Sequence, residues 1–284
     1  MTLPSASLLA QSVLSGVFIG ALYGLLGLGL SLSWGLLRQI NLALFAFAFL
    51  AAYVCYQLAQ QGMDPLVTLV VIVPAFFALG ALLQALLARF AITPFNSLLV
   101  TFGITGIVEA LIQSIWTADF RKLESSYGEH RWKLAGLYVP LPELITLLFS
   151  AGLAFAVWAV LRYTYFGKAV RAASQEPSMA AAFGINHRAN ALLIAGLCAA
   201  SAAVAGIFIA LTTTLAPSQM FAWFGVVFAV VIIGGLGNPL GALVAGVLIG
   251  IAESMTMALI APAWAPIVSF SLLIALLIWQ PRWL

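Results

Sequence analysis

The chain has 284 residues, of which 64% are hydrophobic and only 7% are charged, and its mean hydropathy is +1.15. Soluble domains carry about 25% charged residues, so this composition excludes a soluble protein, which could not cover its surface in water. The net charge of +3 comes from a few scattered basic residues, which argues against a nucleic-acid-binding protein. We therefore expect an all-α polytopic membrane protein in which residues 1–284 form a single transmembrane domain.

Nine apolar segments approach the length of about 20 residues that a helix needs to cross the hydrocarbon core. These segments are 9–34, 42–59, 66–88, 97–117, 141–161, 191–214, 221–233, 240–260 and 266–279. The seventh is short, so we expect a bundle of about eight to ten spanning or partly spanning helices. The first segment lacks a basic n-region and is too long for a cleavable signal peptide, so we expect it to be retained. Cys55 and Cys198 both lie in apolar runs, which predicts neither a disulfide framework nor a metal site.

The basic residues are unevenly shared between the two sets of alternate connections. Seven of the eleven fall in one set: Arg38, Arg89, Arg162, Lys168, Arg171, Arg188 and Arg282. The other four share the long connection at about 118–140 with three acidic residues. Because Lys and Arg are retained on the cytoplasmic side, we expect a periplasmic N-terminus and a cytoplasmic C-terminus. The connection at about 118–140 is then periplasmic, and the one at about 163–190 is cytoplasmic.

Small residues repeat every fourth position on two of the expected helices. The repeats are Gly16, Gly20 and Gly24 on the first, and Ala242, Gly246, Gly250 and Ser254 on the eighth. Such stripes let helix backbones approach closely in lipid, so they predict helix packing.

The cytoplasmic connection has the pattern of two short helices. The Ala-rich stretch 168–175 favours a helix, and Pro177 suits the first position of a second one. That second helix is predicted to end at Gly184 as a left-handed cap, with Ile185 as the following apolar contact. The pair is either a docking element for a soluble partner or a linker held at the lipid headgroups by its basic residues.

This connection resembles the cytoplasmic loop of branched-chain amino acid ABC transporter permeases of the LivH type. The family pattern is similar to G-r-A-x-R-A-x-a-q-D/E-x-x-x-A-x-x-x-G-I-N. The matching residues are Gly167, Ala169, Arg171, Ala172, Gln175, Glu176, Ala180, Gly184, Ile185 and Asn186. The turn that contains Gly235, Gly237, Pro239 and Gly241 also resembles a family element, as does the closing motif at 280–282.

The resemblance implies the permease subunit of an importer in the bacterial inner membrane. It would move branched-chain or other hydrophobic amino acids by alternating access. The implied coupling residues, seated in an ATPase subunit, are Gly167, Lys168, Arg171, Ala172, Gln175, Glu176, Gly184 and Asn186. The implied partners are two cytoplasmic ATP-binding subunits, a periplasmic substrate-binding protein and a second permease subunit, homologous or identical.

The chain itself is not expected to be an enzyme. The glycine-rich turn at 235–241 has neither the Lys nor the hydroxyl residue of a phosphate-binding loop, so we interpret it as a structural turn. ATP and magnesium are therefore expected on the partner ATPase, with no cofactor in this chain.

Three residues are candidates for the substrate pathway. Glu109 and Glu253 lie about half-way along apolar segments, where an ionisable group is a functional hypothesis by default; the alternative is a hydrogen bond between helices. Asn41 belongs to a stretch similar to the family motif r-x-I-N-F-A-H-G, which interrupts a helix. Leu44 and Phe45 replace the usual His and Gly, which makes the segment more apolar and more helical.

Because of that departure, the substrate stays open, with urea, an amide, a carboxylate or an aromatic compound as alternatives. A secondary transporter or channel is a further alternative, but such a protein requires intramembrane charges arranged for ion coupling. A membrane enzyme requires clustered His, Asp or Cys residues, whereas His130 and His187 are expected on opposite sides of the membrane.

Overall fold

The computed structural model describes residues 6–90, 93–129, 131–134 and 137–279 of the chain. The closing motif at 280–282, with Arg282, lies outside the described residues, as does His130.

All nine apolar segments form helices, and two short helices follow the fifth, as the sequence predicted. The long helices are α1 (Ala6–Leu37), α2 (Ala43–Gln60), α3 (Leu69–Arg89), α4 (Pro94–Trp116), α5 (Leu141–Tyr163), α8 (His187–Thr212) and α10 (Pro239–Leu259). The shorter ones are α6 (Tyr165–Gln175), α7 (Pro177–Ala182), α9 (Gln219–Gly234) and α11 (Ala265–Trp279), with a 3-10 turn at Pro262–Trp264. The seven long helices are long and apolar enough to cross a membrane, whereas α9 and α11 have only 16 and 15 residues. The multi-pass architecture is therefore confirmed.

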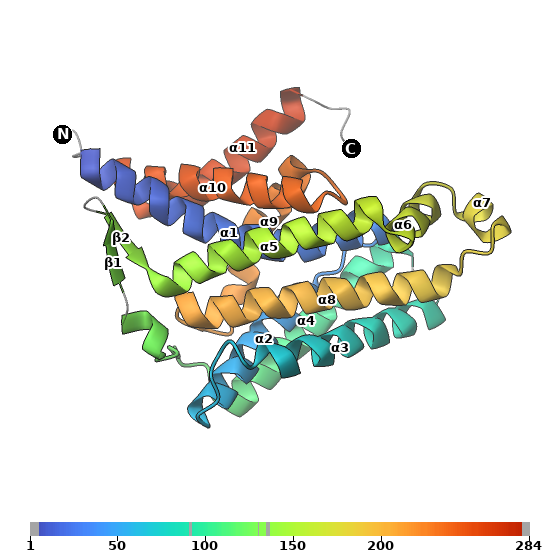
Figure 1. Ribbon diagram of the computed structural model, residues 1–284, viewed down its shortest axis with the longest axis horizontal. Coiled ribbons are helices and arrows are strands. Elements are labelled where there is room, and N and C mark those ends of the chain that lie inside the picture. The colour runs from blue at the N-terminus through green and yellow to red at the C-terminus, as the bar shows by residue number, and fades with distance from the viewer. Residues whose placement is uncertain (1–5, 91–92, 130, 135–136, 280–284) are drawn as a thin grey trace.

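Helices α1 and α10 pack against each other along the two predicted stripes of small residues. A Cβ atom added to Gly20 would lie 2.5 Å from the carbonyl oxygen of Gly246, and one added to Gly16 would lie 2.7 Å from that of Gly250. The pairing runs antiparallel, because Gly24 meets Leu243 nearer the start of α10. The two helices lie side by side in Figure 1. Backbones this close are possible only where both helices lack side chains at the contact.

Helices α2 and α8 form the centre of the bundle. Side chains on every face of α2 are buried, among them Phe45, Phe49 and Tyr53. Much of α3, α4 and α5 instead exposes large apolar side chains, such as Val70, Ile107 and Leu148. An apolar exterior of this kind is compatible with lipid and would aggregate in water.

The connection between α4 and α5 is partly ordered by a β-hairpin that the sequence did not predict. Strand β1 (Arg131–Leu134) pairs antiparallel with β2 (Leu137–Pro140), with Trp132 opposite Val139. A 3-10 turn at Ser126–Glu129 precedes it. Strands of four residues are too short to show a clear alternation of apolar and polar residues, which explains the omission.

This connection is fastened to three other parts of the bundle. The amide of Gln11 on α1 exchanges two hydrogen bonds with the Tyr138 backbone, at 2.9 and 3.0 Å. The Tyr127 hydroxyl donates to the Asp64 carboxylate at 2.7 Å, and this hydrogen bond raises the pKa of Tyr127. A backbone bridge joins Arg121 to Leu215. The connection therefore forms a fixed surface over one end of the bundle.

Candidate functional site

The short helices α6 and α7 project from the end of the bundle opposite the hairpin (Figure 1). Helix α6 follows α5 with only Thr164 between them, and the Thr164 hydroxyl accepts a hydrogen bond from the Gly167 amide at 3.1 Å. A Cβ atom at Gly167 would overlap the Leu161 carbonyl oxygen on α5. Glycine at this position therefore allows the sharp elbow that folds α6 back against the bundle.

The side of α6 that faces away from the bundle carries polar and charged residues. Gly167 and Val170 are buried, whereas Lys168, Arg171 and Gln175 are exposed. Ala172 and Glu176, two further residues of the predicted coupling element, are exposed as well. The amphipathic helix thus presents a continuous surface from which several hydrogen-bond donors and one carboxylate extend.

Helix α7 has the two caps that the sequence predicted. Pro177 occupies its first turn. Gly184 has φ +81°, the left-handed conformation, and its amide donates to the Ala181 carbonyl at 2.9 Å. The Ile185 amide donates to the Ala180 carbonyl at 3.1 Å, which completes the hydrogen-bond pattern of a Schellman cap.

Asn186, also predicted in the coupling element, is the N-cap of α8. Its side-chain oxygen accepts a hydrogen bond from the Ala189 amide at 3.0 Å. The His187 ring lies 2.6 Å from the Pro177 carbonyl oxygen. Gly184 and Asn186 therefore define the path of the chain, while the residues of α6 supply the exposed functional groups.

The predicted structural turn between α9 and α10 is held against α1. Gly235 and Gly237 both have positive φ angles, of +88° and +75°. The Ser31 hydroxyl on α1 donates to the Gly235 carbonyl, and the Gly237 amide contacts the Ser31 hydroxyl and carbonyl oxygens, with all three distances 3.0 Å.

The remaining two residues of this turn lie at the start of α10. Pro239 occupies its first turn, and Gly241 donates its amide to the N-cap side chain of Asn238 at 3.1 Å. The Gly241 backbone also approaches that of Gly234 so closely that a Cβ atom at Gly241 would overlap it.

Asn41 lies in the short segment between α1 and α2, where it is buried. Its side-chain oxygen accepts a hydrogen bond from the Ala43 amide at 3.1 Å. The next amide, of Leu42, donates to the Thr101 hydroxyl on α4 at 3.1 Å. Leu44 and Phe45 follow inside the first turn of α2, so the segment is helical there, as their replacement of His and Gly predicted.

The two intramembrane acids occupy different environments. Glu253 on α10 is buried, with 4% of its surface exposed, and accepts a hydrogen bond from the Tyr23 hydroxyl of α1 at 2.9 Å and another from the Ser269 hydroxyl of α11. Glu109 on α4 is half-buried and accepts a hydrogen bond from Gln113 of the same helix at 3.1 Å. Glu253 thus joins three helices, whereas the hydrogen bond of Glu109 stays within one.

The structure does not bring Asn41, Glu109 and Glu253 together. Glu253 lies beside Tyr23, whereas Asn41 follows the end of α1, about 14 residues and on the order of 20 Å further along that helix. No hydrogen bond joins any two of the three in the part of the chain that the structure describes. The His, Cys, Asp and Glu residues that it describes also form no group of three or more that could hold a metal ion.

Several polar contacts of the candidate pathway could not be identified from apolar length alone. Ser97, Thr101 and Thr105 are fully buried on one face of α4, and their spacing of four residues was the available sequence signal. Tyr23 and Ser269 were also missed as partners of Glu253; a lone hydroxyl in an apolar helix was the only indication of either.

Known proteins resemble the chain along nearly its whole length. The sequence model for the permease component of branched-chain amino acid transport systems matches residues 12–277. LivH of Salmonella typhimurium, a high-affinity branched-chain amino acid transport permease, is 27% identical over 95% of this chain and 93% of its own length. BraD of Pseudomonas aeruginosa, with a similar description, is 22% identical over 95% and 94%. No solved structure gives a significant match. The chain belongs to the family of permease components of branched-chain amino acid transport systems.

Proposed function

We propose that this chain is the membrane-spanning permease subunit of a binding-protein-dependent importer for branched-chain or other hydrophobic amino acids. The observation that carries the proposal is the α6–α7 pair, which projects beyond the long helices with Lys168, Arg171, Gln175 and Glu176 exposed. Family membership and the apolar exterior support a multi-pass protein of the bacterial inner membrane. The work of transport is then done by conformational change, and ATP and magnesium bind to a separate chain.

The partners follow from this assignment. Two ATP-binding subunits would receive the α6–α7 pairs of two permease subunits, one of them this chain and the other homologous or identical. ATP-driven closure of the ATPases would move α6, and α6 is joined to α5 through the Gly167 elbow. This contact would transmit the movement to the bundle.

The proposed orientation has the N-terminus in the periplasm and the end of α11 in the cytoplasm. It is supported by the basic residues near the α6–α7 end, among them Arg38, Arg162 and Arg188. The hairpin surface at the other end would then receive the substrate-binding protein. Tyr138 and Trp132, both exposed on the hairpin, give this surface aromatic groups suited to a protein contact.

The proposed pathway runs beside Asn41, where the segment between α1 and α2 meets the buried hydroxyl groups of α4. It is placed there because Asn41 and Thr101 are polar groups buried among apolar side chains such as Leu44 and Phe45. An amino acid with an apolar side chain requires both polar and apolar groups. Glu253 is assigned to holding α1, α10 and α11 together, because both of its oxygens accept hydrogen bonds from neighbouring helices.

Uptake and ATP hydrolysis by the reconstituted importer test the proposal. Proteoliposomes that contain this chain with its ATPase and second permease, supplied with the substrate-binding protein, are compared with matched proteoliposomes in which the chain carries Arg171→Glu or Glu176→Lys. Both residues are exposed, so the substitutions should leave the bundle folded. Reversal of a charge at a protein interface weakens the contact by several kcal/mol, so we expect leucine uptake to fall by about tenfold or more.

A matched control is Arg89→Glu, which reverses an exposed charge at the end of α3, outside both the α6–α7 pair and the hairpin end. It should leave the response of uptake to ATP unchanged. Unchanged uptake in both α6–α7 variants would overturn the coupling assignment. ATP-independent uptake by this chain alone would instead favour a secondary transporter or channel.

A further inference from the structure

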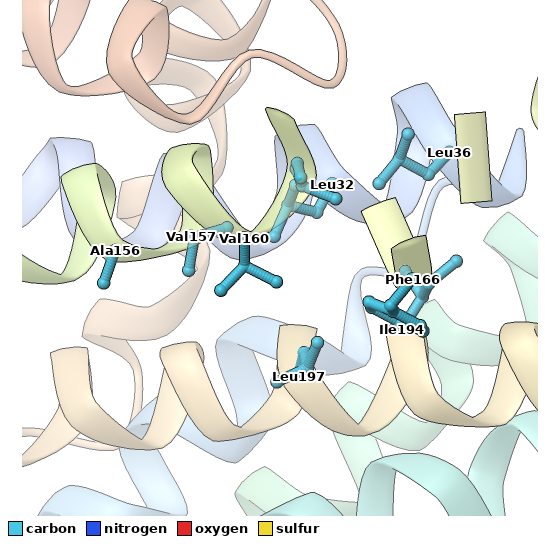
Figure 2. A pocket seen from close by; sticks show the side chains of 9 residues that line it. Leu32, Leu36, Ala156, Val157, Val160, Phe166, Ile194 and Leu197 are labelled. Carbon is cyan, nitrogen blue, oxygen red and sulfur yellow. The ribbon is translucent and has the colours of Figure 1, made fainter. Parts of the chain in front are cut away.

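An apolar cavity of about 130 Å³ lies between α5 and α8 (Figure 2). Its lining comes from four helices and contains only apolar residues, among them Leu32, Leu36, Val160, Phe166, Ile194 and Leu197. Leu32 and Leu36 of α1 form the side toward the interior, and Phe166 of α6 lies at one end. An apolar cavity of comparable size excludes water but accepts an apolar ligand.

A second recess, of about 210 Å³, adjoins the first under α6 and shares Leu36 and Ile194 with it. Its lining is polar as well as apolar and includes Arg38, His187 and Asn190. Together the two recesses form what we term the α8 groove. Along α8 the lining of the groove changes from apolar to polar toward the start of the helix, in the order Leu197, Ile194, Asn190, His187, and Arg38 adds a cation at that end.

The polar end of the groove lies near aromatic and basic residues typical of a membrane interface. The Arg162 guanidinium lies 5.3 Å from the ring centroid of Trp158, and the Lys168 ammonium lies 5.3 Å from that of Tyr165. Trp and Tyr gather at the level of the lipid headgroups. The apolar part of the groove therefore extends from this level along the hydrocarbon-facing side of the bundle.

Within the described part of the chain, the cation at the polar end forms no ion pair. Arg38 is exposed, and none of the described carboxylates forms a salt bridge with its guanidinium. The nearest acid in sequence to the groove is Glu176, beside the lining residue Pro177, and it forms no ion pair with Arg38 in the described part of the chain. An anion with an attached apolar chain would match both ends of the groove.

We propose that the α8 groove binds an anionic glycerophospholipid from the bilayer. Part of one acyl chain occupies the apolar cavity between α5 and α8, and the phosphate lies at Arg38 beneath α6. Charge complementarity favours an anionic lipid over a zwitterionic one. The single positive charge of Arg38 is neutralised by a headgroup with a net negative charge, whereas a zwitterionic headgroup brings a positive charge of its own. The bound lipid would support α6 from below, since Val170 and Ser174 of α6 line the same recess. The proposal depends on the membrane location of the chain and is independent of the transported solute.

Native mass spectrometry of the full chain in detergent, titrated with phosphatidylglycerol, tests the proposal. Leu197→Trp fills the apolar cavity, and Leu193→Trp is its control, because Leu193 is on the same helix, is similarly exposed (43% against 38%) and lines neither recess. Arg38→Gln removes the cation, and its control is Arg89→Gln, at the exposed end of α3. Each chain is also titrated with phosphatidylcholine and with inorganic phosphate.

We expect the unmodified chain and both controls to bind one phosphatidylglycerol more tightly than the others. Arg38→Gln should weaken this binding by about tenfold, the loss expected for one charge-assisted contact. Leu197→Trp should also weaken it, because the indole ring occupies the space of the acyl chain. If Leu197→Trp fails to fold, the affinities of Arg38→Gln and Arg89→Gln for phosphatidylglycerol still test the proposal. Equal binding by these two arginine variants would overturn the proposal. Equal affinity for the two lipids, or displacement of the lipid by inorganic phosphate, would also overturn it. The same holds if the chain forms a dimer whose lipid binding is unaffected by Leu197→Trp.

Discussion

The contact between α1 and α10 makes a quantitative prediction for Gly20→Ala. The new Cβ atom would lie 2.5 Å from the Gly246 oxygen and from the Val247 Cα atom, whereas ordinary contacts begin at 3.4 Å. The helices must therefore separate by about 0.9 Å. Overpacking costs about 1–3 kcal/mol, and we expect the upper value because both obstacles are backbone atoms. Alanine has a higher helix propensity than glycine, which offsets about 1 kcal/mol of this cost. The free energy of unfolding should therefore fall by about 2 kcal/mol.

Reversible unfolding in mixed micelles, followed by circular dichroism, measures this change. Gly152→Ala on α5 is the matched control, because a Cβ atom there meets no atom within 4 Å. The control should be neutral or should stabilise the chain by up to about 1 kcal/mol. Gly24→Ala should fall between them, since its nearest obstacle is at 2.9 Å and another is a flexible leucine side chain. Equal free energies of unfolding for Gly20→Ala and Gly152→Ala would refute the close packing of α1 on α10.

Three further predictions concern polar and backbone contacts. Glu253→Leu leaves the hydroxyl groups of Tyr23 and Ser269 without their acceptor and should lower the free energy of unfolding by about 1–3 kcal/mol. Glu253→Gln retains an acceptor and should lower it less. Loss of uptake by the Gln variant at unchanged stability would contradict the structural role. Thr101→Val removes the acceptor of the Leu42 amide, so hydrogen exchange at Leu42 should become faster while exchange in α10 is unchanged. Gly184→Ala forces a side chain into the left-handed region at a cost of about 1–2 kcal/mol, and α7 should become more sensitive to proteolysis than in Gly128→Ala, where a Cβ atom has open space.

Sequence reasoning located the helices because the length of an apolar segment is a local property. The same is true of the α7 caps, since Pro177 and Gly184 act on the backbone next to them. The small-residue stripes on α1 and α10 were also visible, but nothing in either stripe specifies its partner. Their pairing is a long-range result of the whole bundle, and only the structure shows it.

The candidate pathway was harder to predict, because the face on which a polar residue lies depends on its neighbours. Glu109 and Glu253 have similar positions in their segments, yet one bonds within its own helix and the other joins three helices. Asn41 was found through its motif, whereas the contact of Leu42 with Thr101 spans 59 residues. Hydrogen bonds between distant helices leave no periodic pattern in the sequence.

The elbow between α5 and α6 has a mechanical consequence. A single residue separates the two helices, and the Gly167 backbone rests directly on Leu161. The connection between α5 and α6 therefore contains no flexible linker that could absorb a displacement of α6. A force applied to α6 would turn α5 as a stiff lever, and α5 is among the spanning helices with the least protein around them. Motion at the end of the bundle would therefore reach the lipid-facing side before it disturbed the central helices.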